Sequence, residues 1–131
     1  GENVHCAVWP GSDHNTKDIT RFIARESRSY VISVSSLMNK NDFPKDTPYI
    51  EELLAAAPEQ LANGGSCVAN PDGSWLIEPQ VNTEGVFCAE IQLDRVYEER
   101  QNFDPVGHYS RPDVTQLHVN RERQSTIKIK D

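Results

Sequence analysis

The fold class is decided by VHCAVWPGSDHNTKDITRFIARESRSYVISVSSL, residues 4–37. Val4–Val8 is a short apolar run that predicts an interior strand, and the proline–glycine pair after it breaks the strand because proline has no amide to donate. Tyr30–Leu37 is rich in tyrosine, valine, isoleucine and serine, which predicts a second strand. The segment between the two strands is polar overall, and its apolar residues recur at the spacing of a helix.

A helix is predicted between these strands. Ile19, Phe22 and Ile23 follow the i, i+3, i+4 spacing of one apolar helix face. Asn15 or Thr16 is the predicted N-cap, because both residue types accept a hydrogen bond from a free amide of the first turn. Residues 4–37 therefore indicate a strand–helix–strand unit.

The rest of the chain continues the alternation. The further predicted elements are a surface loop at Met38–Pro48, a helix at Tyr49–Ala57, a hairpin of Gly65–Ala69 and Ser74–Glu78 around Asn70–Gly73, a strand at Gly85–Ile91, a helix capped by Asp94 and a final strand at Thr115–Val119. Strands interleaved with helices around a central hairpin favour an α/β layered sandwich.

Composition excludes several classes of protein. The chain has 131 residues and a net charge of −7, with no cluster of lysine and arginine, which argues against a nucleic-acid partner. Arg21, Arg25 and Arg28 recur at helical spacing but alternate with Asp18 and Glu26, so a solvated ion-pair face is predicted. No apolar run is long enough for a membrane span and no signal-peptide pattern is present, so no membrane partner is expected.

Three cysteines, Cys6, Cys67 and Cys88, stand at wide spacing among apolar residues. An odd count at such spacing argues against a disulfide framework or a zinc site, and indicates buried reduced thiols in a cytoplasmic protein. His5 adjoins Cys6, yet neighbouring residues of a strand point to opposite faces. A histidine–cysteine catalytic dyad is therefore not expected there.

The other polar clusters give no catalytic pattern. Gly64–Cys67 lacks the spacing of a serine nucleophile turn, and its glycines instead predict a close backbone approach. Glu51, Glu52, Glu78, Glu98 and Glu99 are interpreted as solvated charge, and the histidines are too scattered for a metal site. Gly107–Asp113 combines aromatic rings, an arginine and an aspartate. The residues leave two interpretations of this segment open, an ordered crossing loop or a contact surface.

Taken in order, several segments resemble the part of nitrilases that follows the active-site cysteine. These segments are Val8–Gly11, Arg21–Glu26, Tyr30–Ser33, Asn63–Ser66, Pro71–Gly73, Glu78–Pro79, Glu99–Asp104 and Gly107–Asp113. They span about nine-tenths of the chain, and the match thins after Arg123.

The resemblance implies a four-layer αββα sandwich, of which residues 1–131 would supply the C-terminal half of a single carbon–nitrogen hydrolase domain. It also implies hydrolysis of an organic nitrile to a carboxylic acid and ammonia, with no cofactor. Family members use a cysteine thiolate, a glutamate base, a lysine and a second glutamate, through a thioimidate and an acyl-enzyme. None of these four residues maps onto this sequence, and their motifs would precede Gly1.

Two groups of residues do carry over. Trp9 and Pro10 match the point where nitrilases line the substrate pocket, as opposed to a tryptophan that only caps the sheet end. His108, Tyr109 and Arg111 match a region that crosses toward a neighbouring subunit, which predicts a homo-oligomer of dimers stacked into spirals.

The resemblance leaves two further readings open. The chain could be a catalytically empty binding or assembly partner of a full-length relative. Alternatively, its parent could belong to the branch of the family that acts on cyanide or amides.

Overall fold

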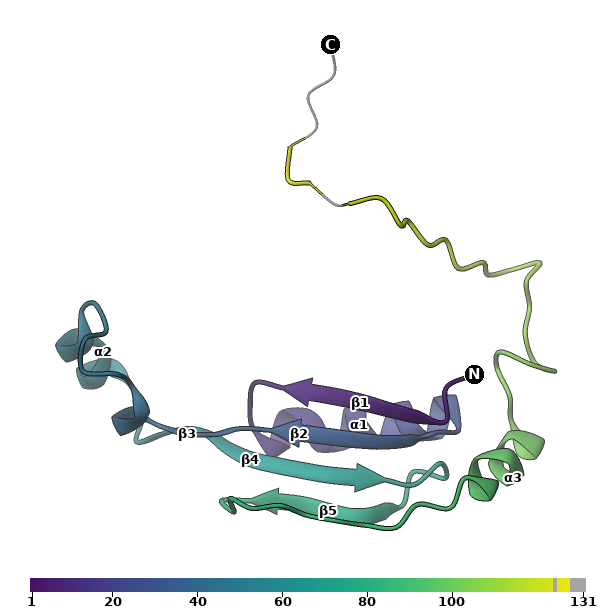
Figure 1. Cartoon of the computed structure of the whole chain (residues 1–131), viewed down its shortest axis with the longest axis horizontal. Helices are drawn as coiled ribbons and strands as arrows, with labels where there is room; N and C mark the ends of the chain where they lie inside the picture. The colour runs from purple at the N-terminus through teal and green to yellow at the C-terminus, as the bar shows by residue number, and fades with distance from the viewer. Residues whose placement is uncertain (124, 128–131) are drawn as a thin grey trace.

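The computed structural model describes residues 1–123 and 125–127, and they form a mixed α/β structure with one sheet (Figure 1). In chain order the elements are β1 (Val4–Trp9), α1 (Asp13–Ser27), β2 (Tyr30–Ser35), β3 (Leu37–Asn39), the 3-10 helix η1 (Lys40–Asp42), α2 (Ile50–Ala56), β4 (Gln60–Ala69), β5 (Trp75–Val81) and α3 (Asp94–Asn102).

The sheet has five strands with β4 at its centre. β1 pairs with β2 in parallel, in a register that places Trp9 opposite Ser35. β4 pairs antiparallel with β2, with β5 and, over its first half, with the short β3. The strand–helix–strand unit and the central hairpin predicted from sequence are thus confirmed.

Helix α1 covers one face of this sheet (Figure 1). The core beneath it consists of Ala7, Ala24, Val31 and Ala69, with Trp9, Ile23 and Trp75 packed around them. Small side chains at the centre let the helix approach the strands closely, and the two tryptophans fill the space at either side.

Among the residues that the structure describes, no helix lies over the other face of the sheet (Figure 1). Side chains of a strand alternate between faces, so Cys6 and Val8 point away from α1. Val8 is 81% exposed and Val34, its partner on β2, is 50% exposed. This open face is an apolar surface for which the described chain supplies only a partial cover.

Helix α1 begins earlier than the sequence predicts. Asn15 and Thr16 are inside the helix, which starts at Asp13 after Ser12. The amide of Asp13 donates to the side-chain oxygen of Asn63 on β4, 3.0 Å away. The prediction was wrong because the cap is supplied by a residue 50 positions further along the chain.

Two predicted strands are absent from the described residues. Gly85–Ile91 and Thr115–Val119 have no regular secondary structure. Neither segment pairs with a strand among the described residues, and a local pattern alone does not determine pairing. A smaller correction is that the predicted loop at Met38–Pro48 begins with residues of β3, which pairs with the early part of β4.

Helix α3 is fastened to one end of the sheet by charged side chains. Arg28 Nη1 lies 2.9 Å from Glu99 Oε2, and Arg95 pairs with Asp72 in the β4–β5 turn. Arg28 also lies over the Phe103 ring, 5.6 Å from its centroid. The prediction of a purely solvated charge pattern on α1 was therefore wrong at Arg28.

Candidate functional site at the carboxyl edge of the sheet

The parallel strands β1 and β2 end at the same edge of the sheet. Residues Trp9–Ser12 leave β1 there, and Ser35–Leu37 connect β2 to β3. In α/β sheets with parallel strands, ligands bind outside the carboxyl ends of the strands. A binding site is therefore expected at this edge of the sheet.

Asn63, Gly64 and Gly65 bring the start of α1 against β4 at this edge. Asn63 Nδ2 donates a hydrogen bond to Asp13 Oδ1 at 2.8 Å. The backbone amide of Asp13 donates a second one, at 3.0 Å, to Asn63 Oδ1. Gly65 has φ +100°, and a Cβ at this position would lie 2.7 Å from the Cβ of Asp13. The close backbone approach predicted for these glycines is confirmed.

The same contacts set the charge of Asp13. The hydrogen bond from Asn63 holds the pKa of this carboxyl below its usual value of 3.8, against the opposing effect of burial. Lys17, one helical turn away, also lowers this pKa. Asp13 is thus an anionic structural group at the first turn of α1, where negative charge favours the helix dipole.

Ser66 closes the sheet at this edge with its side chain. Its hydroxyl accepts a hydrogen bond from the Ser35 amide at 3.0 Å and donates one to the Ser35 carbonyl at 3.1 Å. The regular β2–β4 ladder ends at Ser33 and Cys67, so the serine hydroxyl takes the place of the next backbone pair.

Trp9 lies on the α1 face of the sheet, partly buried against the core, and Pro10 is exposed where the chain leaves β1. The Trp9 Nε1 atom is buried and has no hydrogen-bond partner among the described residues, and the same holds for Ser35 Oγ. Since Trp9 and Ser35 are opposite each other in the β1–β2 register, two unsatisfied polar atoms come from facing positions. A buried donor without a partner costs about 1–3 kcal/mol.

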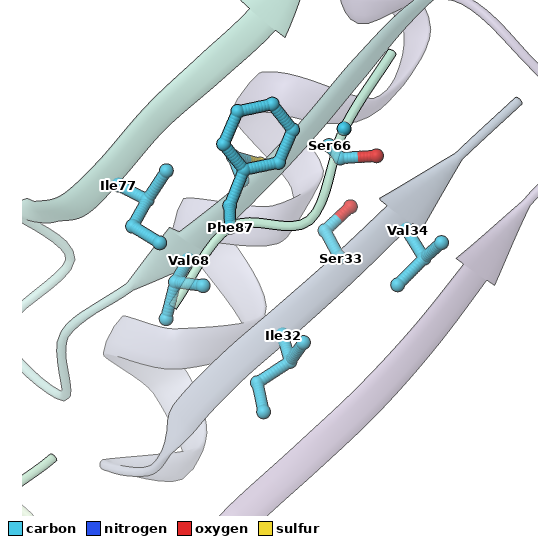
Figure 2. Close-up of a pocket in the computed structure, with 9 residues that line it drawn as sticks. Ile32, Ser33, Val34, Ser66, Val68, Ile77 and Phe87 are labelled. Atoms are coloured by element: carbon cyan, nitrogen blue, oxygen red, sulfur yellow. The ribbon is translucent and has the colours of Figure 1, made fainter. Parts of the chain in front are cut away.

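Two adjoining cavities open on the other face near this edge. The first, of about 170 Å³, is apolar and is lined by Ile32, Val34, Val68, Ile77 and Phe87 among others (Figure 2). The second, of about 530 Å³, is more polar and includes Ser36, Asn39, Asp42, Thr83 and Glu84. Trp9 and Pro10 line neither of these two cavities, and their assignment as a pocket wall stays a prediction.

The three thiols lie apart from any catalytic partner that the structure shows. Cys67 is buried under α1, where burial raises the pKa of its thiol against the opposing effect of hydrogen bonds with Ser33 and Thr20. Cys6 and Cys88 are exposed, so the prediction that all three are buried was wrong for these two. His5 pairs with Glu2 at 3.0 Å, on the face opposite to Cys6.

His108, Tyr109 and Arg111 lie together on an exposed segment beyond α3. The His108 and Tyr109 rings are 4.6 Å apart, and Phe103 lies 5.3 Å from Tyr109. Arg111 forms two hydrogen bonds with Asp113, at 2.7 and 2.6 Å, and this pair lowers the pKa of the Asp113 carboxyl. The chain then runs away from the sheet (Figure 1).

Sequence reasoning missed the residues that organise the edge. Asn63 and Ser66 act through partners 50 and 31 residues away, so no local pattern announces them. The one available signal was the pair of adjacent glycines, Gly64 and Gly65. Such a pair indicates a close approach of two backbone segments but does not identify the second segment.

Within residues 1–123 and 125–127, no helix has the length and apolar character needed to cross a membrane.

The comparisons with known proteins give a consistent result. A nitrilase of Bradyrhizobium diazoefficiens is 36% identical over 92% of this chain and 37% of that protein. An arylacetonitrilase of Fusarium vanettenii is 32% identical over 99% of this chain and 43% of its own length. No family model matches the chain. By its sequence, the chain is similar to nitrilases over 92% and 99% of its own length.

The nitrilase relatives differ in what their names say they act on. An aliphatic nitrilase of Sinorhizobium fredii is 29% identical over 97% of this chain, beside the arylacetonitrilase already described. The chain spans about two fifths of the length of the curated nitrilases it matches, with 37%, 43% and 41% covered in these three.

Proposed function

We propose that this chain forms one layer and part of the substrate pocket of an enzyme that hydrolyses an organic nitrile to a carboxylic acid and ammonia. In this proposal a thiolate attacks the nitrile carbon, and water resolves the thioimidate through an acyl-enzyme. A glutamate base and a lysine that stabilises developing charge would assist. The proposal further assigns the nucleophile to the part of the protein outside these residues.

The observation that carries this assignment is the state of the three cysteines. A catalytic cysteine needs a thiolate close to a base in a partly accessible site. Cys67 is buried with a raised pKa, which opposes thiolate formation. Cys6 points away from its neighbour His5, and Cys88 is on a segment whose amides form no hydrogen bond with any described residue. The chain alone is therefore proposed to be inactive.

A four-layer αββα arrangement is proposed for the whole domain. Support comes from the contrast between the two sheet faces, since α1 covers one face and the other exposes valines such as Val8 at 81%. Two sheets pack through apolar inner faces at about 10 Å separation. A second sheet on the open face would complete helix–sheet–sheet–helix order. The unpaired thiols fit a reducing compartment such as the cytoplasm.

Trp9 and Pro10 are proposed to form a wall of the nitrile pocket, with Trp9 selecting aromatic substrates. The test is a chimera in which this chain replaces the matching part of the Fusarium vanettenii arylacetonitrilase. Trp9→Ala is expected to lower kcat/KM for phenylacetonitrile by about tenfold relative to an aliphatic nitrile, because an aromatic contact of the substrate is lost.

Trp75→Ala is the matched control, since Trp75, on β5, packs against the same core as Trp9. It should destabilise the chimera without changing the ratio between the two nitriles. If both substitutions change the ratio of the two kcat/KM values equally, Trp9 does not line the substrate pocket. A folded chimera that hydrolyses only cyanide or amides would assign the other branch, and one with no activity would favour a catalytically empty assembly partner.

His108, Tyr109 and Arg111 are proposed as an interface in a homo-oligomer. They are exposed, yet the rings pack together and Arg111 is held by Asp113, so the surface is preorganised. In the chimera, Arg111→Ala should lower the mass measured by light scattering. An unchanged mass would contradict the interface role.

A further inference from the structure

Residues 84–91, called here the crossing segment, lie across the open face of the sheet without pairing. They carry the pattern that predicts a strand at Gly85–Ile91, yet they have no regular structure. Within the part of the chain that the structure describes, the amides of this segment have no hydrogen-bond partner. The segment is exposed to solvent along almost its whole length, and it does not form the strand that its sequence pattern predicts.

Phe87 is the main contact of the crossing segment with the sheet. Its ring lies beside Ile77, Val68 and Ser66 over the apolar cavity of about 170 Å³ (Figure 2). Phe87 is 40% exposed, whereas its neighbour Val86 is 93% exposed. One aromatic side chain thus holds the segment over an apolar surface.

Strand β5 offers a second place for the same segment. β5 pairs with β4 on one side, and its other edge has no strand beside it among the described residues. β5 has 7 residues, and Gly85–Ile91 has the same number. An edge strand of this kind is a template for a further strand.

The two ends of the crossing segment are fixed at the two ends of β5. At the start, the Asn82 amide donates to the Asn63 carbonyl at 2.8 Å, and Asn82 has the positive φ of 55° common in hairpin turns. At the other end, Tyr30 contacts Gln92, and Arg95 holds α3 to Asp72 in the β4–β5 turn. Either position of the segment therefore joins the same two anchored points.

We propose that the crossing segment is a two-position cover. In the first position Phe87 lies over the apolar cavity of the open face. In the second position Gly85–Ile91 pairs antiparallel with the free edge of β5 and leaves the cavity open. The first position shields the open face until another layer packs on it, and this last step alone rests on the proposed function.

The test uses amide hydrogen exchange of the chain as it stands, measured by NMR for residues 86–91. In the unsubstituted chain these amides should exchange at nearly unstructured rates, while those of β5 that face β4 are protected. Phe87→Thr keeps a strand-forming residue but removes the ring that covers the cavity. It should raise protection in the crossing segment by about tenfold, because lost burial of an aromatic ring shifts a two-state equilibrium by that order.

Val86→Thr is the matched control and should leave the exchange rates unchanged, since Val86 makes no comparable contact. Protection of residues 86–91 equal to that of β5 in the unsubstituted chain would overturn the proposal, because the segment would already be a strand. Unchanged or lower protection in Phe87→Thr would also overturn it. Neither result depends on nitrile hydrolysis, so a failure here is separate from a failure of the proposed function.

Discussion

At Gly65 the first turn of α1 approaches β4 more closely than any side chain allows. The residue combines a φ of +100° with a distance of 2.7 Å from a would-be Cβ to the Cβ of Asp13. Both the backbone conformation and the space require glycine. The position of the Trp9–Ser12 turn, and hence of Trp9, depends on this contact.

Gly65→Ala is expected to destabilise the chain by about 3 kcal/mol, since a strained φ and a steric clash add. Gly11→Ala is the matched control, because a Cβ at Gly11 meets nothing within 4 Å. Urea unfolding of the two variants gives the comparison. If both variants unfold at the same urea concentration, Gly65 and Asp13 are not in close contact in solution.

Asn63 and Asp13 make the stability of this edge depend on pH. The pKa of Asp13 is lowered in the folded chain, chiefly by the Asn63 hydrogen bond. A lowered folded pKa gives stability that is present above the unfolded pKa, near 3.8, and is lost as pH falls through the folded pKa.

Asn63→Ala should bring the Asp13 pKa, measured by NMR titration, back toward 3.8 and cost about 1 kcal/mol at neutral pH through the lost cap. The cost should shrink below pH 3.8, where Asp13 is increasingly protonated in the unfolded chain. A cost that is the same at pH 2 and pH 7 would mean that Asn63 acts on packing alone.

At the scale of elements, α3 is attached through pairs that connect distant parts of the chain. Arg28, in the left-handed conformation at the end of α1, reaches Glu99, and Arg95 reaches Asp72. Burial alone would raise the pKa of Asp72, but hydrogen bonds from Ser74 and the charge of Arg95 hold it below its usual value. The helix thereby fixes one end of the crossing segment.

Glu99→Gln should weaken the attachment of α3 by about 1 kcal/mol, because the Arg28–Glu99 pair is only partly screened by solvent. Faster amide exchange confined to α3 would report this loosening. Glu98→Gln, at the exposed neighbouring position, should leave exchange unaltered. If both variants behave alike, the ion pair does not hold the helix.

These elements also show what sequence could and could not predict. The helical period of α1 and the turn residues Asn70–Gly73 are local signals, and the structure has a helix and a turn at these places. The predicted apolar stripe is not the buried face of α1, because Ile19 and Phe22 are 42% and 66% exposed. The buried residues of the helix are Thr16, Thr20 and Ala24. The start of α1, the partners of Arg28 and the pairing of β3 depend on residues 20 or more positions away. The strand pattern at Gly85–Ile91 is a local preference, and this segment pairs with no strand among the described residues.

At the scale of the molecule, the family came from the order of many weak motifs, which is a property of the whole chain. The proposed pocket wall at Trp9 and the proposed interface at Arg111 could not be derived from spacing, because each would be completed by atoms outside the described residues. In the proposed account, the chain is one layer of a nitrilase-like enzyme, and none of Cys6, Cys67 and Cys88 is its nucleophile.

The most direct test of this account is ammonia release by the purified chain incubated with phenylacetonitrile and an aliphatic nitrile. The account predicts no ammonia release above a protein-free blank. It predicts the same result for the variants in which Cys6, Cys67 or Cys88 is replaced by serine. Ammonia release that disappears on replacing one of these cysteines would place the nucleophile in this chain and contradict the account.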